Sequence, residues 1–144
     1  MSTTRTPADP AQTLRDAMRA VRAIDYTIVF ARDLPAMRRF YGETLGFTLQ
    51  RELSPRWIEY RIGSNILALT VHGNGLFDDP PPPKGALSLQ LAFRVAPAEV
   101  HVCADALKAA GIRLLHEPTD HAFGHRTVFF RDPDGNVLEI YAEI

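Results

Sequence analysis

The order of periodic segments along the chain repeats once, and this repeat limits the possible folds more than any other feature. Residues 24–31 predict a strand rich in branched and aromatic residues, and residues 32–47 predict a helix with a buried apolar stripe. Three short strands follow, at 47–53, 56–62 and 66–72. The same order returns at 87–142. Two βαβββ modules predict one α+β domain with pseudo-twofold symmetry and a shared core.

Glycine and proline positions place the turns and the module boundary. Residues 73–86, "GNGLFDDPPPPKGA", predict a connector with neither helix nor strand between modules at about 24–72 and 87–142. In "DPDG", Pro133 suits the first central turn position and Gly135 suits a left-handed conformation. We therefore expect one domain over residues 24–144.

A further helix is predicted before the first module. Residues 1–8 are polar and we expect them to be disordered. Residues 9–23 predict a helix with Asp9 as N-cap and Pro10 at its first position. Its apolar side chains follow helical spacing: Leu14, Ala17, Met18 and Val21. Such a stripe must be buried, so we expect it to pack on the main domain or on a partner chain.

The composition narrows the class of protein. A net charge of −1 and an isoelectric point near 6.5 offer no basic surface for nucleic acid. No apolar run approaches the roughly 18 to 20 residues that span a bilayer, and the polar N-terminus lacks the apolar core of a signal peptide. The single cysteine, Cys103, excludes an internal disulfide. We expect a cytoplasmic protein that binds neither nucleic acid nor membranes.

Two stretches carry a resemblance to a known family. "IDYTIVFARDLPAMRRFYGETLGF" and "GHRTVFFRDPDGNVLEIYAE" resemble the vicinal oxygen chelate superfamily, which contains glyoxalase I, bleomycin-resistance proteins, fosfomycin-resistance enzymes and extradiol dioxygenases. The resemblance covers roughly residues 24–143. It implies two four-stranded sheets that curl into an open cup with helices on the convex side, and it implies a homodimer. In the metal enzymes of the family, ligands project into the cup from the first and last strands of each module.

The four positions that match those ligands suit a metal only in part. Where relatives often carry His, Glu, His and an acidic residue, this chain has Tyr26, Ala68, Gln90 and Glu139. Tyrosine binds metals as phenolate, which its pKa near 10 disfavours, alanine has no donor, and glutamine is a weak neutral ligand. We therefore expect no complete metal centre. If Zn, Ni, Mn or Fe binds, Glu139 would hold it, with Gln90 and Tyr26 as weak ligands.

Strand alternation assigns further candidates to the cup. Arg94 shares the face of Gln90, where it could form an ion pair with Glu139 or clamp a carboxylate or phosphate of a ligand. Other candidate ligand contacts are Trp57, Phe123 and His125, and core or interface positions explain Trp57 and Phe123 equally well. The candidates for proton transfer are Glu139, Tyr26 and His72.

Three functions remain open at this point. The first is a protein that binds a small organic molecule in a cup between the two modules without a metal. The second is a divalent-metal-dependent lyase, isomerase or dioxygenase that resembles glyoxalase I. The third is a metal-free enzyme that uses a cup Tyr, His or Glu for proton transfer. The incomplete ligand set favours the first and third, and we expect the first.

Overall fold

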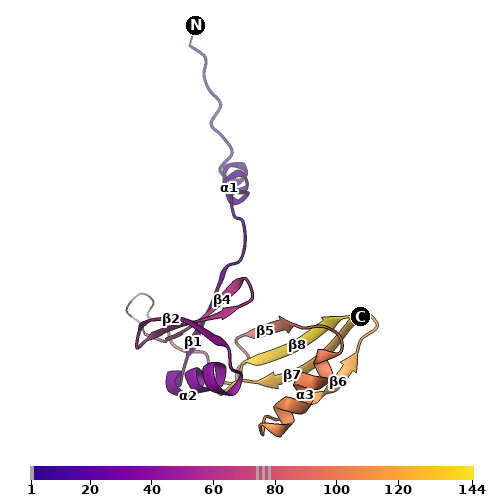
Figure 1. The fold of residues 1–144 in the computed structure, drawn as a ribbon. Helices are drawn as coiled ribbons and strands as arrows, with labels where there is room; N and C mark the ends of the chain where they lie inside the picture. The colour runs from indigo at the N-terminus through magenta and orange to yellow at the C-terminus, as the bar shows by residue number, and fades with distance from the viewer. Residues whose placement is uncertain (1, 74, 76, 78) are drawn as a thin grey trace.

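The computed structural model describes residues 2–73, 75, 77 and 79–144, which form two four-stranded sheets (Figure 1). The first sheet has the order β1-β4-β3-β2, with bounds β1 Tyr26–Ala31, β2 Thr48–Ser54, β3 Trp57–Ile62 and β4 Asn65–Val71. The second has the order β5-β8-β7-β6, with bounds β5 Gln90–Arg94, β6 Leu114–Asp120, β7 His125–Arg131 and β8 Val137–Glu143. In each sheet the first and last strands of the module pair in parallel. The predicted α+β fold of two βαβββ modules is confirmed.

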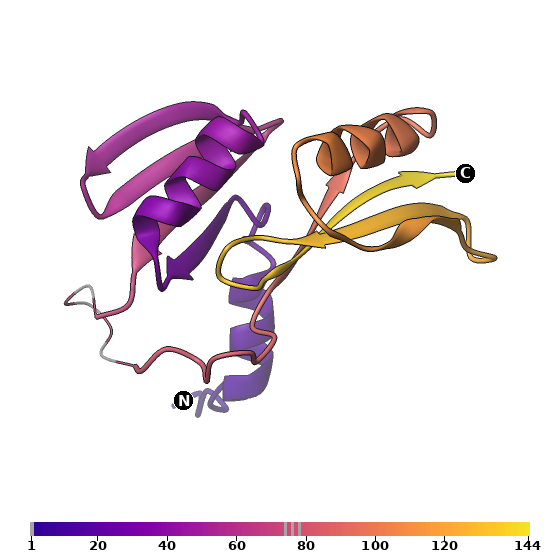
Figure 2. The same cartoon turned by 90° about the horizontal axis from the view of Figure 1, so that it is seen from below.

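Each module contains a helix between its first two strands. The helix α2 (Leu34–Arg39) continues directly into the π-helical turn η1 (Phe40–Thr44), and α3 spans Glu99–Ala109. The Asp33 side chain caps α2 by accepting a hydrogen bond from the Ala36 amide at 3.0 Å. Gly46, with φ 71°, takes the left-handed conformation at the end of the segment, as glycine does readily. Figure 2, seen from the helix side, shows α2 across the first sheet and α3 across the second.

The apolar core lies between the helices and the sheets and is shared by both modules. Met37 and Tyr41 of the first module are fully buried and belong to one cluster with Val29. Phe130 and Leu138 of the second module belong to the same cluster. Because burial of each large apolar side chain contributes about 1.5–3 kcal/mol, this cluster holds the two modules together.

A buried hydrogen bond also joins the modules. The Tyr41 hydroxyl donates to Asp132 Oδ2 at 2.8 Å. The same carboxylate accepts hydrogen bonds from the backbone amides of Asp134 and Asn136, both at 3.0 Å, and from Asn136 Nδ2 at 2.9 Å. Burial raises the pKa of Asp132, against the lowering effect of these donors. The predicted turn is confirmed, with Gly135 at φ 88°, and its first residue additionally connects the modules.

The helix α1 (Pro10–Met18) stands apart from the two sheets (Figure 1). The Asp9 side chain accepts a hydrogen bond from the Ala11 amide at 3.1 Å, and Pro10 is the first helical residue. Leu14, Met18 and, beyond the helix end, Val21 are all exposed. Of the two alternatives for this stripe, packing on the main domain is therefore not observed, because the helix stands apart from the two sheets. Packing against a partner chain stays a prediction.

The connector between the modules has neither helix nor strand in the residues that the structure describes, as the glycines and prolines predict. Positions 74, 76 and 78 of the predicted connector lie outside the described residues. In the described part of the chain, no helix has both the length and the apolar character needed to cross a membrane.

Candidate functional site

The candidate binding surface consists of the faces of the two sheets that point away from α2 and α3, and we call them the open faces. On β1, Val29 and Ala31 are buried towards the helices, whereas Tyr26, Ile28 and Phe30 are 43%, 41% and 36% exposed. Exposed apolar side chains that lie together on one face mark an interaction site. On the second sheet, the open face contains Gln90, Ala92 and Arg94 of β5 together with Glu139 and Tyr141 of β8.

The polar centre of the first open face is a buried carboxylate. Glu59 on β3 lies opposite Ala68 of β4 and is only 1% exposed. Its Oε1 accepts a hydrogen bond from the Tyr26 hydroxyl at 3.3 Å. Its Oε2 accepts hydrogen bonds from Arg51 Nε at 2.6 Å and from Trp57 Nε1 at 3.1 Å. We call these four residues, Tyr26, Arg51, Trp57 and Glu59, the Glu59 cluster.

The cluster keeps Glu59 ionised. Burial is the largest influence and raises the pKa of Glu59, but the hydrogen bonds from Arg51, Trp57 and Tyr26 and the charge of Arg51 together outweigh it. The pKa of Glu59 is therefore lowered. The same hydrogen bond and charge raise the pKa of Arg51. The result is an ion pair with one buried and one solvent-facing partner.

The sequence predicts two of these four residues, Tyr26 and Trp57, as site residues. Trp57 lies on the open face, which favours its predicted site position over a place in the core. Glu59 follows Trp57 by two residues, so strand alternation alone was enough to include it. Arg51 could not be found in that way, because the register of β2 shifts between Leu49 and Arg51.

Glu139 contacts Gln90 on the second open face. Gln90 Nε2 donates to Glu139 Oε2 at 3.1 Å, while Arg94 pairs with Glu143 at 3.0 Å. Of the two roles considered for Arg94, the ion pair with Glu139 is therefore not formed, and the clamp for a ligand stays a prediction. Arg94 lies opposite Tyr141 of β8. On β8, Glu139 precedes Tyr141 by two residues and Glu143 follows Tyr141 by two residues. Gln90 donates a hydrogen bond to Glu139, and Arg94 forms an ion pair with Glu143.

A row of rings extends this face towards the loop between β6 and β7. His121 stacks on Phe123 with ring centroids 4.9 Å apart, and the rings of Phe123 and His125 form a T-shaped pair with centroids 5.3 Å apart. His125 stacks on Tyr141 at 5.0 Å. The predicted ligand contacts Phe123 and His125 therefore lie together, and Phe123 is exposed. Such a wall offers stacking partners to a flat organic molecule.

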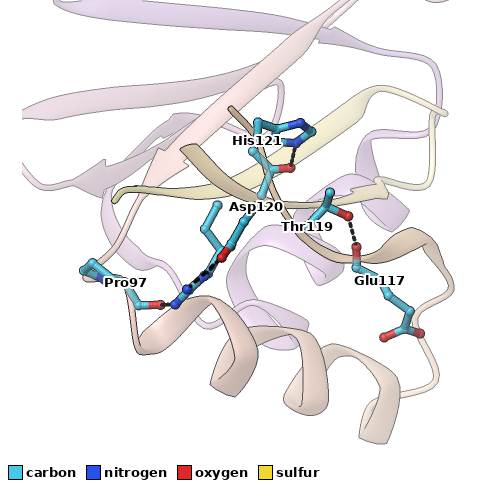
Figure 3. A network of polar contacts seen from close by, with 7 residues as sticks. Pro97, Glu117, Thr119, Asp120 and His121 are labelled. Carbon is cyan, nitrogen blue, oxygen red and sulfur yellow. Dashed lines mark hydrogen bonds and ion pairs between the residues drawn. The ribbon is translucent and has the colours of Figure 1, made fainter. Parts of the chain in front are cut away.

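Hydrogen bonds hold the base of this loop in place (Figure 3). The His121 Nε2 atom lies 2.7 Å from Thr127 Oγ1. The Arg126 guanidinium donates to the two carboxylate oxygens of Asp120 at 2.6 and 3.0 Å and to the Pro97 carbonyl at 3.2 Å. Because Pro97 precedes α3, Arg126 ties the β6–β7 hairpin to the start of that helix.

His72 lies in a separate pocket of about 200 Å³ between the modules. The pocket is lined by residues of both modules: Ile28, Val29, Phe30, Arg32, His72, Pro82, Ser88, Leu89, Asp134 and Asn136. Neither Tyr26 nor Glu139 is among them. The three candidates for proton transfer are therefore in three places, because Tyr26 contacts Glu59 and Glu139 contacts Gln90.

The four positions tested for a metal do not present a suitable ligand set. Ala68 has no donor, and the Tyr26 hydroxyl donates its hydrogen bond to Glu59. Gln90 directs its amide nitrogen, which cannot bind a cation, towards Glu139. Over the residues that the structure describes, no three His, Cys, Asp or Glu side chains converge as a metal site requires. The residues present do not fit a divalent metal ion.

Comparisons with known proteins agree with this fold. The sequence profile of the Glyoxalase/Bleomycin resistance protein/Dioxygenase superfamily matches residues 23–140. A lactoylglutathione lyase from Agrobacterium tumefaciens is 26% identical, with a TM-score of 0.70 over 85% of this chain and 95% of that chain. A glyoxalase-related enzyme from Fulvimarina pelagi is 28% identical, with a TM-score of 0.69 over 85% and 89% of the two chains. A glyoxalase/bleomycin resistance protein/dioxygenase from Nocardioides is 22% identical, with a TM-score of 0.74 over 93% of each chain. No curated protein sequence matches the chain.

Proposed function

The chain belongs to the glyoxalase/bleomycin resistance protein/dioxygenase superfamily, and from this premise we propose that it binds a small organic molecule on its open faces without a metal centre. The observation that carries the proposal is the combination on the first open face of exposed apolar side chains with the Glu59 cluster. An apolar surface with a few fixed polar groups is typical of small-molecule sites. The ring row from His121 to Tyr141 supplies a similar surface on the second sheet.

The metal-free part of the proposal is supported by the chemistry of the donors. Glu139 is the acidic residue among the four family positions, and the Gln90 amide already donates to it. A single carboxylate gives a divalent cation too few ligands for tight binding. The proposal is therefore that Glu139 binds organic ligand groups or Gln90 instead of a metal ion.

Metal titration tests this part. The protein is exposed to Ni²⁺, Zn²⁺, Mn²⁺ and Fe²⁺, and the bound metal is measured after dialysis for the wild type, Glu139→Gln and Glu143→Gln. Glu143 is a matched control, because it is an exposed carboxylate on the same strand whose partner is Arg94. We expect substoichiometric metal in all three proteins. Stoichiometric metal that disappears in Glu139→Gln and persists in Glu143→Gln would overturn the proposal.

Thermal-shift screening tests the binding of small molecules. A ligand that binds only the folded state raises the melting temperature as its concentration increases. We expect apolar acids and aromatic compounds to raise the melting temperature. For each compound, we expect the rise to be the same with and without a chelator. A response that requires added metal would contradict the proposal and would support a lyase, isomerase or dioxygenase of the metal-dependent kind.

We further infer a cytoplasmic homodimer in which α1 packs on the second copy. The exposed side chains Leu14, Met18 and Val21 lie on a segment that extends away from the two sheets. Exposed apolar side chains on such a segment suit contact with another chain. Mass in solution, measured by light scattering for the full chain and for a variant that lacks residues 1–22, tests this inference. A truncated protein that stays dimeric would remove the helix from the interface.

A further inference from the structure

We propose that Arg51 is the anion-binding residue of the first open face and that the ligand there is an organic carboxylate with an apolar body. The inference rests on the proposed function and names the class of ligand for the same site. It follows from how Glu59 holds the guanidinium, from the local balance of charge and from the apolar surfaces beside it.

Glu59 holds the guanidinium of Arg51 through the nitrogen nearest the side-chain stem. The hydrogen bond of 2.6 Å joins Glu59 Oε2 to Nε, the nitrogen nearest the side-chain stem. Glu59 is 1% exposed while the Arg51 side chain is 55% exposed, so the guanidinium extends from the buried carboxylate towards solvent. An arginine that is hydrogen-bonded through Nε can use its two terminal nitrogens to donate to the two oxygens of a ligand carboxylate. The Tyr26 hydroxyl is a further polar neighbour of this guanidinium.

The charge balance of this face favours an anion. Over the described residues, Glu59 is the only carboxylate paired with Arg51. Arg61 follows Glu59 by two residues on β3, and its Nε donates to the uncharged Gln50 side chain at 3.2 Å. By strand alternation Arg61 shares the face of Glu59, so β2 and β3 give this face the guanidinium groups of Arg51 and Arg61 and the carboxylate of Glu59. That carboxylate already accepts three hydrogen bonds. A ligand approaching from solvent meets the cations first.

Apolar surface lies next to the guanidinium. Tyr26 and Trp57 both donate to Glu59, so their aromatic rings lie close to the carboxylate that holds Arg51. Ile28 continues the same face of β1 and is 41% exposed. An aromatic or aliphatic body can cover these side chains while its carboxylate pairs with Arg51. Inorganic anions lack such a body, which is why we assign the site to organic acids.

Trp57 provides a direct readout, because it is the only tryptophan of the chain and bonds to Glu59. Phenylacetate and its neutral analogue phenylacetamide are titrated into the full-length protein at constant ionic strength, and the fluorescence of Trp57 is recorded. Both probes share the ring and differ in charge. We expect a saturable change with phenylacetate and an apparent affinity for phenylacetamide weaker by about tenfold or more, the effect of about 1.4 kcal/mol.

Two substitutions test the role of Arg51. Arg51→Gln removes the charge, and we expect it to abolish the preference for the acid. Because this variant leaves Glu59 buried without its cation, folding is checked by circular dichroism. Arg51→Lys keeps a cation near Glu59 but removes the fork of two nitrogens, and we expect the preference to fall in a folded protein. Arg38→Gln is the matched control, since Arg38 is a partly exposed arginine that pairs with Glu52 away from the open face.

The outcomes separate this inference from the proposed function. A preference for the acid that falls in Arg51→Lys and persists in Arg38→Gln supports the inference. Equal affinity for the two probes, a preference unchanged in Arg51→Lys, or no response to either probe overturns it. The proposed function is judged independently by the thermal-shift screen, in which a bound neutral compound would sustain small-molecule binding even when Arg51 has no part in it.

Discussion

Removing the hydroxyl of Tyr41 is expected to weaken the contact between the two modules. The ring of Tyr41 is fully buried, and its hydroxyl donates to Asp132 Oδ2 at 2.8 Å across the module boundary. Tyr41→Phe keeps the buried ring and deletes this one hydrogen bond. Asp132 then keeps its donors from Asp134 and Asn136 but loses the one that comes from the other module. A buried hydrogen bond to an acidic group contributes about 1.5–3 kcal/mol to the free energy of unfolding.

Urea denaturation measures this loss. With a slope of about 2 kcal/mol per molar urea, a loss of about 2 kcal/mol lowers the midpoint by about 1 M. Tyr26→Phe is the matched control, because Tyr26 also donates to a carboxylate, at 3.3 Å, but its side chain is partly exposed. We expect the control to lose less than half as much. A midpoint for Tyr41→Phe that equals the wild type, or that falls no further than in Tyr26→Phe, would refute the reasoning.

Three further predictions concern a helix cap, a carboxylate and a thiol. Asp33→Ala removes the cap of α2 and is expected to lower the free energy of unfolding by about 1 kcal/mol in urea. The pKa of Glu59 is lowered on folding, so its contribution to stability is present above its unfolded pKa and is lost as the pH falls through the folded pKa. In acid titrations of stability, the difference between wild type and Glu59→Gln is therefore expected to shrink as the pH falls below the unfolded pKa. Burial, with the charge of Glu99, raises the pKa of the Cys103 thiol, so alkylation by iodoacetamide at about pH 8, followed by mass spectrometry, is expected to be slower than for a free thiol.

Local chemistry made most of the fold predictable from the sequence. Asp33 and Gly46 mark the two ends of the segment formed by α2 and η1, and both act through backbone geometry within a few residues. The alternation on β1 correctly separates the buried Val29 from the exposed Ile28. Features of this kind depend on neighbours in the chain, which a single sequence contains.

Three features of the structure could not be predicted from the sequence, because each depends on a contact between separate elements. Strand alternation puts Glu139 and Glu143 on either side of Tyr141, the register partner of Arg94, and only the structure shows that Arg94 pairs with Glu143 while Gln90 donates to Glu139. The position of Arg51 depends on a register shift in β2, which reverses the simple count of alternating faces. Asp132 looks like an ordinary turn residue until Tyr41 from the other module is placed against it. Each of these contacts joins residues that are distant in the sequence or displaced by an irregularity.

The pairing of Ala68 with Glu59 changes the chemistry expected of the first open face. The resemblance described above implies a metal-ligating carboxylate at the Ala68 position, whereas here the carboxylate is Glu59, one strand away, opposite Ala68 and beside Arg51. An ionised carboxylate that already accepts three hydrogen bonds has little capacity left for a cation, and it presents a guanidinium to solvent instead. Under the proposed binding of an organic acid, affinity depends on charge that salt screens and does not depend on a metal. The affinity for an organic acid is therefore expected to fall with rising ionic strength and to be unchanged by a chelator, the opposite of what a metal centre would produce.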